Sequence, residues 1–327
     1  MSKRVKITVF VIAILIFSFI IPTSYLSVMP GTIEDLGEMV EVDYELNSNE
    51  KNSFFMVTIL QQGASLMDLF YGLLNPNIDI IHQLEVIPPG LDEEKYEEMM
   101  TDWMEESQLL AKYIAMEETG FEIEMENYGI EVIDFLEESP SKEYLEEDDV
   151  IVEVEGEEIF FIDQLLVMVQ DREIGDKVEL KVLRNDEMKT FNIPTVEHET
   201  EPGKPALGIY ITTLEDQELS LPVNIEIMAG DISGPSAGIM FVVELINQLE
   251  SEDITGGKEI AGTGTINYFK EVGAIGGVKQ KVVTAENAGI EYFIIPEENY
   301  EEAEAVVKDM ELVPVSTLQD VMDFLEE

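Results

Sequence analysis

The chain has 327 residues, of which 70 are acidic and 18 are basic, so its formal net charge is −52. A surface of this charge repels nucleic acid and anionic lipid, which excludes DNA or RNA as a partner. The length suits roughly two or three domains, and the absence of cysteine excludes disulfide bonds and thiol sites.

The N-terminus predicts a membrane anchor within residues 1–28. Three basic residues within Met1–Lys6 precede the apolar run Ile7–Ile21. This run is short for a bilayer, but Tyr25–Val28 can extend it. Basic residues ahead of a span keep its start in the cytoplasm, so we expect a single-pass protein of the cell membrane with the bulk of the chain outside the cytoplasm. A cleaved signal peptide is the rival interpretation; the sequence after Ile21 lacks a convincing small-residue cleavage site, which favours an uncleaved anchor.

Residues 29–120 are predicted to form a juxtamembrane α/β region. Phe54–Leu60 is rich in residues that favour strands. From Glu93 to Met116 apolar side chains recur at helical spacing, which predicts a helix whose apolar stripe packs in a core.

Residues 121–197 carry the pattern of a mainly-β domain. Gly129–Phe135 alternates as a strand, Ile162–Val169 suits a helix and Val178–Leu183 a further strand. This order resembles a bacterial-type PDZ domain, and PDZ domains bind an extended peptide as an added strand beside a helix. The alternative is a domain that only packs on the rest of the protein. The resemblance implies a peptide groove lined by Gly129, Ile130, Val132, Leu165, Leu166 and Val169.

Residues 205–327 predict an α/β domain, because short apolar runs alternate with segments of helical period. Thr317 with Asp320 predicts a helix N-cap, and Gly289 predicts a helix C-cap. Strands are expected at Leu207–Ile211, Val223–Ile227, Glu259–Ile266, Tyr292–Ile295 and Leu312–Val315, and helices at Ser236–Leu249, Val278–Ala288, Tyr300–Lys308 and Thr317–Leu325.

Ser236 is the candidate nucleophile. It lies in Gly234–Gly238, between a predicted strand and a predicted helix, where helix-start N–H groups can face an oxyanion. The letters also fit the G-x-S-x-G turn of α/β-hydrolases, but there the histidine follows the serine, whereas His82 and His198 both precede Ser236. A chymotrypsin-like order with His198 as base stays open, although His198 lies in a polar, linker-like stretch.

Lysine is the remaining candidate for the base. Lys279 follows Gly276–Gly277 and falls in the first turn of a predicted helix, where the helix dipole disfavours a cation. An amine buried there loses its proton more easily and can act as a general base, which predicts an alkaline optimum. Lys281 is expected on another face of the helix, so Lys279 is preferred.

Four blocks together resemble the proteolytic domain of Lon-type peptidases: Gly234–Gly238, Thr263–Ile266, Gly276–Lys279 and Ile294–Asn299. The resemblance implies a Ser-Lys dyad endopeptidase with Ser236 as nucleophile and Lys279 as base. It also implies supporting roles for Thr263, Ala237 and Gly234, with Thr263 orienting the amine. Ser233 departs from the family, since cytoplasmic Lon enzymes carry an acidic residue there.

The expected fold is therefore an α/β (α+β) Lon-type proteolytic domain preceded by a mainly-β PDZ domain and an N-terminal transmembrane helix. No phosphate loop of the G-x4-G-K-[ST] type occurs, so neither ATP nor another cofactor is expected, and no acidic cluster has calcium-loop spacing. The predicted function is ATP-independent hydrolysis of protein or peptide substrates. The sequence is also compatible with a homo-oligomer. The alternative is a catalytically inert, membrane-tethered PDZ scaffold.

Overall fold

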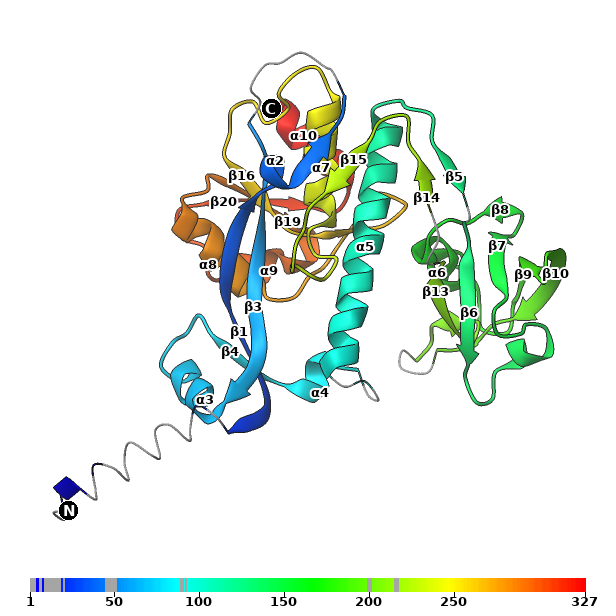
Figure 1. Ribbon diagram of the computed structural model, residues 1–327, viewed down its shortest axis with the longest axis horizontal. Helices are drawn as coiled ribbons and strands as arrows, with labels where there is room; N and C mark the ends of the chain where they lie inside the picture. Colours follow the sequence, from blue (N-terminus) through cyan, green and yellow to red (C-terminus); the bar gives the residue numbers. More distant parts are fainter. Residues whose placement is uncertain are drawn as a thin grey trace. The chain divides into compact units, whose positions relative to one another are not determined.

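The computed structural model describes residues 21–44, 52–88, 91, 93–126, 128–198, 202–214 and 218–327, together with residues 4, 5, 8 and 19. The chain divides into two compact units, which Figure 1 colours along the sequence. The first unit comprises Met1–Ala115, Ile225–Ile266 and Glu271–Glu327, and the second comprises Met116–Asn224 and Asn267–Lys270.

A mixed six-stranded sheet forms the centre of the first unit, in the order β20-β19-β16-β3-β1-β4 (Figure 1). The strands from β20 to β3 run parallel to their neighbours, whereas β1 pairs antiparallel with β3 and β4. The unit also contains two separate two-stranded antiparallel sheets, β2 with β15 and β17 with β18. The strands are β1 (Pro22–Asp35), β2 (Val40–Val42), β3 (Phe55–Ser65), β4 (Asp79–His82), β15 (Ile225–Ile227), β16 (Ile260–Gly262), β17 (Thr265–Ile266), β18 (Val272–Gly273), β19 (Tyr292–Pro296) and β20 (Glu311–Val315).

Two helices of this unit carry its chemistry, α7 and α8. Helix α7 is apolar on nearly every side and is buried almost throughout, as such a helix must be. Helix α8 packs on β1 and β3. The helices are α2 (Leu36–Met39), α3 (Leu66–Gly72), α4 (Gln83–Val86), α5 (Glu93–Glu118), α7 (Gly238–Leu249), α8 (Val278–Ala288), α9 (Tyr300–Glu304) and α10 (Leu318–Glu326), with a 3₁₀ turn, η2 (Glu297–Asn299), before α9.

The prediction that Tyr25–Val28 extends a membrane span is wrong. These residues belong to β1, where Leu26 and Val28 are buried and the backbone pairs with β3 and β4. Pro22 starts the strand, because a proline interrupts a helix but suits a strand's first position. The run Ile7–Ile21, apart from residues 8, 19 and 21, lies outside the described residues. Among the residues that are described, no helix has the length and apolar character to cross a membrane.

The predicted boundary between a juxtamembrane region and a C-terminal domain also differs from the structure. Strand β3 of the former pairs in parallel with β16 of the latter, at Phe55 with Ala261 and at Met56 with Gly262. One sheet therefore contains strands that the sequence separates by about two hundred residues. Local periodicity predicts each strand but not its neighbour, so this pairing was not visible in the sequence.

The second unit is built on a sheet in the order β10-β9-β7-β6-β13, with β8 paired to β7. Helix α6 (Ile162–Gln170) packs against β12 and β13. The strand predicted at Leu207–Ile211 of the C-terminal domain corresponds to β13 (Ile209–Thr213), which belongs to this sheet. The remaining elements are β5 (Glu124–Glu126), β6 (Ile130–Phe135), η1 (Pro140–Glu143), β7 (Val150–Val154), β8 (Glu157–Glu158), β9 (Lys177–Arg184), β10 (Glu187–Pro194), β11 (Val196–Glu197), β12 (Pro205–Ala206), β13 (Ile209–Thr213) and β14 (Glu218–Ser220).

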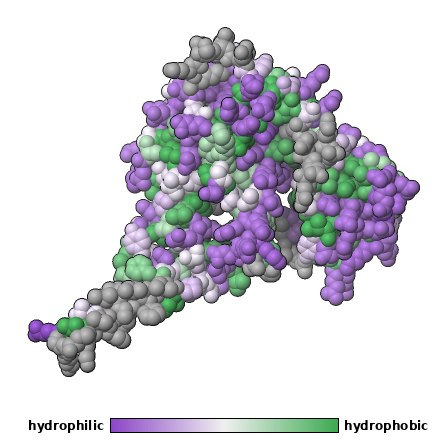
Figure 2. All heavy atoms as spheres, viewed as in Figure 1, coloured by the Kyte–Doolittle hydropathy of each residue, from purple (hydrophilic) through white to green (hydrophobic). Residues whose placement is uncertain are grey.

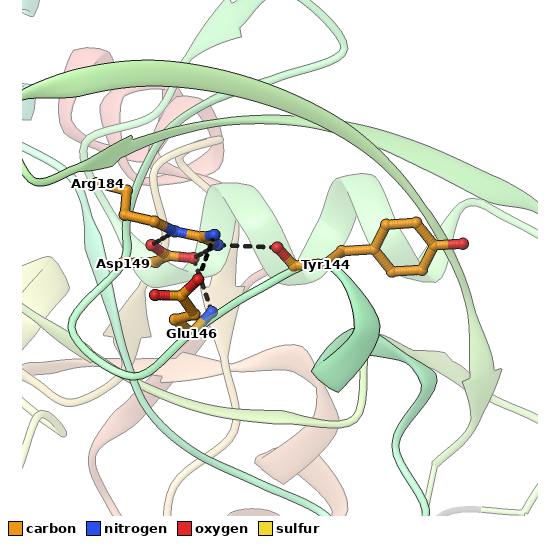
Figure 3. A network of polar contacts seen from close by, with 4 residues as sticks. All are labelled: Tyr144, Glu146, Asp149 and Arg184. Atoms are coloured by element: carbon orange, nitrogen blue, oxygen red, sulfur yellow. Dashed lines mark hydrogen bonds and ion pairs between the residues drawn. The ribbon is translucent and has the colours of Figure 1, made fainter.

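A charged network lies beside the core of the second unit (Figure 3). The Arg184 Nε donates to Asp149 Oδ1 at 2.6 Å, and its Nη2 donates to Asp149 Oδ2 at 2.5 Å. The same guanidinium reaches Glu146 at 2.7 Å and the Tyr144 carbonyl at 2.8 Å. It therefore fixes the loop before β7 to the end of β9.

Both predicted caps are confirmed. Thr317 and Asp320 form a reciprocal capping box at the start of α10, and Gly289 ends α8 with a φ of 84°. Helix α7 begins two residues later than predicted, at Gly238, and α9 ends four residues earlier than predicted, at Glu304.

Candidate active site

The loop before α7 presents Ser236, and helix α5 braces it. Gly234 has a φ of +89°, and its N–H donates to the Met100 carbonyl at 2.8 Å. Ser107 lies about two turns after Met100 on α5, and its hydroxyl donates to the Pro235 carbonyl at 3.5 Å. The sequence predicted α5 as a packing helix only, and nothing in its periodicity indicates this contact.

The Ser236 backbone is held by the segment that follows β16. Its carbonyl accepts the Gly264 N–H and the Thr263 hydroxyl, each at 2.8 Å. The Gly264 carbonyl in turn accepts the Ile239 N–H at 3.2 Å. Gly264 has a φ of 153°, in the region that glycine favours. The serine is thus tied to a strand end as well as to its helix.

The side chain that reaches the serine is that of Lys281. Its Nζ donates to Ser236 Oγ at 2.7 Å and to Thr263 Oγ1 at 2.8 Å. Lys281 lies in the first turn of α8 and is only 2% exposed. It shares the buried face of α8 with Val278, Val282 and Ala285, at the spacing i, i+3, i+4, i+7.

Burial lowers the pKa of Lys281 from 10.5 to about 7. The physical cause is desolvation, because an ammonium loses its hydration when it is enclosed among apolar side chains. A large share of the amine is therefore neutral near neutral pH. A partly buried hydroxyl that is hydrogen-bonded to such an amine is the arrangement expected of a nucleophile and its base.

The prediction of Lys279 as the base is wrong. Its Nζ forms an ion pair with Asp79 of β4, whose other carboxylate oxygen accepts Gln280 Nε2 at 2.7 Å. Residues two apart on an α-helix point about 200° away from each other, so Lys279 and Lys281 face opposite sides. The signal that identifies Lys281 was present in the sequence, because it is Lys281 and not Lys279 that falls on the apolar stripe of α8.

The three predicted supporting residues, Thr263, Ala237 and Gly234, all lie close to Ser236 in sequence or are joined to it by a hydrogen bond. Thr263 is buried, and its hydroxyl links the amine to the Ser236 carbonyl. Ala237 is the N-cap residue of α7 and is buried, and Gly234 shapes the turn.

The helix-start N–H groups expected to face an oxyanion are partly engaged. The N–H of Gly238 donates to the Pro235 carbonyl at 3.2 Å, and that of Ile239 donates to Gly264. Within the part of the chain that the structure describes, the N–H groups of Ser236 and Ala237 make no hydrogen bond. These two donors are the ones that remain beside the nucleophile.

Comparison with known proteins agrees with this geometry. Residues 212–326 match the family described as the Lon protease (S16) C-terminal proteolytic domain, and residues 118–195 match the PDZ domain family. The chain carries a Lon-type proteolytic domain and a PDZ domain. These are the two families that the sequence motifs resemble.

Individual relatives cover the proteolytic domain. The Lon protease of Xanthomonas oryzae pv. oryzae is 34% identical over 125 residues, which are 37% of this chain and 14% of that protein. The Lon protease of Chloroflexus aggregans is 34% identical over 119 residues, 35% of this chain and 14% of that protein. The match thus spans about a seventh of the length of these curated relatives. A solved PDZ domain, of the SdrC-like protein from Listeria monocytogenes, covers 27% of this chain and 90% of that domain at 20% identity, with a TM-score of 0.25.

The peptide groove predicted for the PDZ domain is misplaced. Ile130, Val132, Leu165 and Val169 are buried in the core of the domain, and β6 is paired on both sides, with β7 and β13. A central strand cannot accept an added strand. Of the predicted helix residues, Leu166 alone is exposed.

The end of this sheet beside α6 is formed by β13, with Tyr210 exposed on it. Gly129, predicted to bind peptide, serves close packing: with its φ of +139°, a Cβ there would meet Val150 at 2.5 Å. Sequence reasoning missed β13 because it assigned that strand to the other domain.

Among the described residues, no group of three or more His, Cys, Asp or Glu side chains is placed to hold a metal ion.

Proposed function

We propose that this protein hydrolyses peptide bonds, with Ser236 as the nucleophile and Lys281 as the general base. One observation carries the proposal: the Lys281 Nζ lies 2.7 Å from Ser236 Oγ, and its amine is buried with a pKa lowered to about 7. The domain's membership among Lon-type proteolytic domains supports the reaction class.

In the first half of the reaction, Ser236 Oγ attacks the scissile carbonyl carbon while its proton passes to the neutral amine of Lys281. Negative charge develops on the carbonyl oxygen, where the N–H groups of Ser236 and Ala237 donate hydrogen bonds to it. The Lys281 ammonium then protonates the leaving amine as the carbon–nitrogen bond breaks. The products are a free amine and an ester on Ser236.

In the second half, water attacks the ester with Lys281 again as base, and Ser236 recovers its proton. Thr263 keeps the amine in register throughout, because its hydroxyl accepts one N–H of Lys281 and donates to the Ser236 carbonyl. With one N–H of Lys281 held by Thr263, the lone pair and remaining hydrogens of Nζ can exchange protons with Ser236 and the leaving group.

The proposed setting is extracytoplasmic and membrane-anchored, without ATP. The apolar run Ile7–Ile21 after basic residues supports the anchor, and the absence of a phosphate loop supports independence from ATP. Substrates are then loosely structured polypeptides or exposed loops. An extended segment of such a chain would pair with β13 of the PDZ domain, as peptides do on other open sheet edges.

The test is cleavage of casein by the full-length protein in detergent micelles, without ATP. We expect cleavage by the wild type, loss of it in Ser236→Ala, and retention in Ser251→Ala, an exposed serine beyond α7. A serine-directed fluorophosphonate should label the wild type and not Ser236→Ala. Cleavage that persists in Ser236→Ala would refute the assignment. A wild type that neither cleaves nor reacts would instead favour the inert PDZ scaffold.

A further inference from the structure

Helix α3 presents apolar side chains to the outside. Helix α3 and the turn after it expose five large apolar residues, and Leu73 and Leu74 are 84% and 67% exposed. The five, here called the α3 patch, are Leu66, Phe70, Tyr71, Leu73 and Leu74. Their spacing, i, i+4, i+5, i+7, i+8, places them along one face of the helix and the turn that follows it. Figure 2 shows green, apolar residues over this part of the first unit.

This pattern is the reverse of an ordinary surface helix. In α10, Leu318 and Val321 are buried, and the exposed positions are polar or acidic. In α3 the inward side is only partly buried, at Met67, Leu69 and Gly72, and Gly72 lies so close to β4 that a Cβ there would meet Ile80 at 2.7 Å. The helix thus packs closely at its glycine and exposes its leucine and aromatic side chains. An exposed apolar patch of this kind marks a site that contacts another apolar surface.

Charged residues are sparse in the two segments of the chain that carry and adjoin the patch. Overall 27% of residues are charged, but Asp68 is the only charged residue from position 52 to 78, and positions 7 to 33 carry none. The Asp68 carboxylate is also occupied, because it accepts the Ser65 N–H and hydroxyl in the capping box of α3. The α3 patch is therefore almost free of charge in a protein of net charge −52.

The patch lies where the apolar N-terminal run joins the fold. Pro22 is paired with Ser65, the N-cap of α3, and the Thr23 hydroxyl donates to the Ala64 carbonyl at 2.6 Å. Paired residues in a sheet lie about 5 Å apart, so α3 starts within one strand spacing of the end of Ile7–Ile21. If that run enters a bilayer, α3 stands at the bilayer surface.

We propose that the α3 patch inserts into the headgroup region of a lipid bilayer, as a second membrane contact beside the anchor. The inference rests on the membrane anchoring proposed above. Interfacial contacts of this kind place leucine and phenylalanine among the upper acyl chains and tyrosine at the headgroups, a few ångströms deep. Two contacts, a span and a helix close to its end, hold the first unit in one orientation on the membrane, as a span alone does not.

The absence of cysteine makes a direct test possible in the full-length chain. Leu73→Cys and Leu74→Cys are labelled with a bimane fluorophore and reconstituted in phosphatidylcholine vesicles. Met228→Cys is the matched control, because Met228 is 53% exposed and follows β15, at the other end of the first unit from α3 in Figure 1. Quenching is measured with a nitroxide on the lipid acyl chain and with aqueous iodide.

We expect the lipid nitroxide to quench the labels at 73 and 74 several-fold more than the label at 228, with the opposite order for iodide. Adding Phe70→Glu should abolish the lipid quenching at position 74. Because Phe70 is exposed in the native fold, this substitution should not prevent folding.

A chain that floats with the vesicles but shows equal lipid quenching at all three positions would overturn the α3 contact alone. Protection from both quenchers, with disulfide cross-linking between copies at position 74, would overturn it in favour of a second copy. A chain that does not float with the vesicles would refute the anchor, and with it this inference.

Discussion

The amine of Lys281 lies 2.7 Å from the hydroxyl of Ser236, although 45 positions separate the two residues in the chain. Each side chain sits at the start of a different helix, α7 for the serine and α8 for the lysine. Strand β16 and its following turn lie between them in sequence, and Thr263 of that turn touches both. The turn after β16 therefore links the start of α7 to the start of α8.

The choice between the two lysines of α8 is directly testable. We expect Lys281→Met to reduce peptide cleavage by about 10²–10⁴-fold or more, because it removes the base. Lys279→Met removes only a partly exposed ion pair with Asp79 and should leave the rate within a few-fold of the wild type. Steady-state rates on one fluorogenic peptide measure both, and the reverse ranking would restore Lys279 as the base.

The sequence predicted both domain families, and it brought together Ser236, the proposed nucleophile, and Thr263, because these depend on short motifs. The sequence did not predict which way a side chain points from its helix, or which strands far apart in the chain pair with each other. The glycines before α8 favour Lys279 as the base, whereas the apolar stripe of α8 carries Lys281, the lysine that contacts Ser236. The PDZ groove was misassigned because β13 comes late in the chain and pairs back to β6. The α3 patch was missed since exposure cannot be read from hydrophobicity alone.

The pH dependence of cleavage should follow Lys281. Its pKa is lowered to about 7 by burial, so the amine is protonated and inactive below that pH and neutral above it. We expect kcat/KM to rise with pH through about 7 and then to level off, in agreement with the alkaline optimum that the sequence predicts. A profile that stays flat between about pH 5 and 9 would exclude this amine as the base.

The same burial makes the protein's stability depend on pH. Between about 7 and 10.5 the unfolded chain keeps a proton on Lys281 that the folded chain has lost, so the free energy of unfolding rises with pH over this range. Lys281→Met should remove that increase and raise the melting temperature at neutral pH, since an apolar side chain then fills the site. Calorimetry at several pH values tests this, and an unchanged slope in the variant would contradict the burial of the amine.

Thr263 should act by positioning. Thr263→Val keeps the shape but removes the hydroxyl that accepts from Lys281 and donates to the Ser236 carbonyl. Loss of a hydrogen bond to a charged or partly charged group costs about 1.5–3 kcal/mol, which corresponds to roughly a 10- to 100-fold lower kcat. KM should change little, and Thr263→Ser should recover most of the rate. Equal losses in the valine and serine variants would indicate a packing role.

In the PDZ domain, Arg184 pairs with two carboxylates of different burial, which gives a matched pair of variants (Figure 3). Asp149 is fully buried, so Asp149→Ala leaves the guanidinium without its main partner and should destabilise the domain by about 3–5 kcal/mol. The Glu146 side chain is 66% exposed, so Glu146→Ala should cost less than about 1 kcal/mol. Hydrogen exchange at the amides of β7 and β9 measures both changes in the full-length protein. Similar losses of protection in the two variants would show that burial does not set the strength of this network.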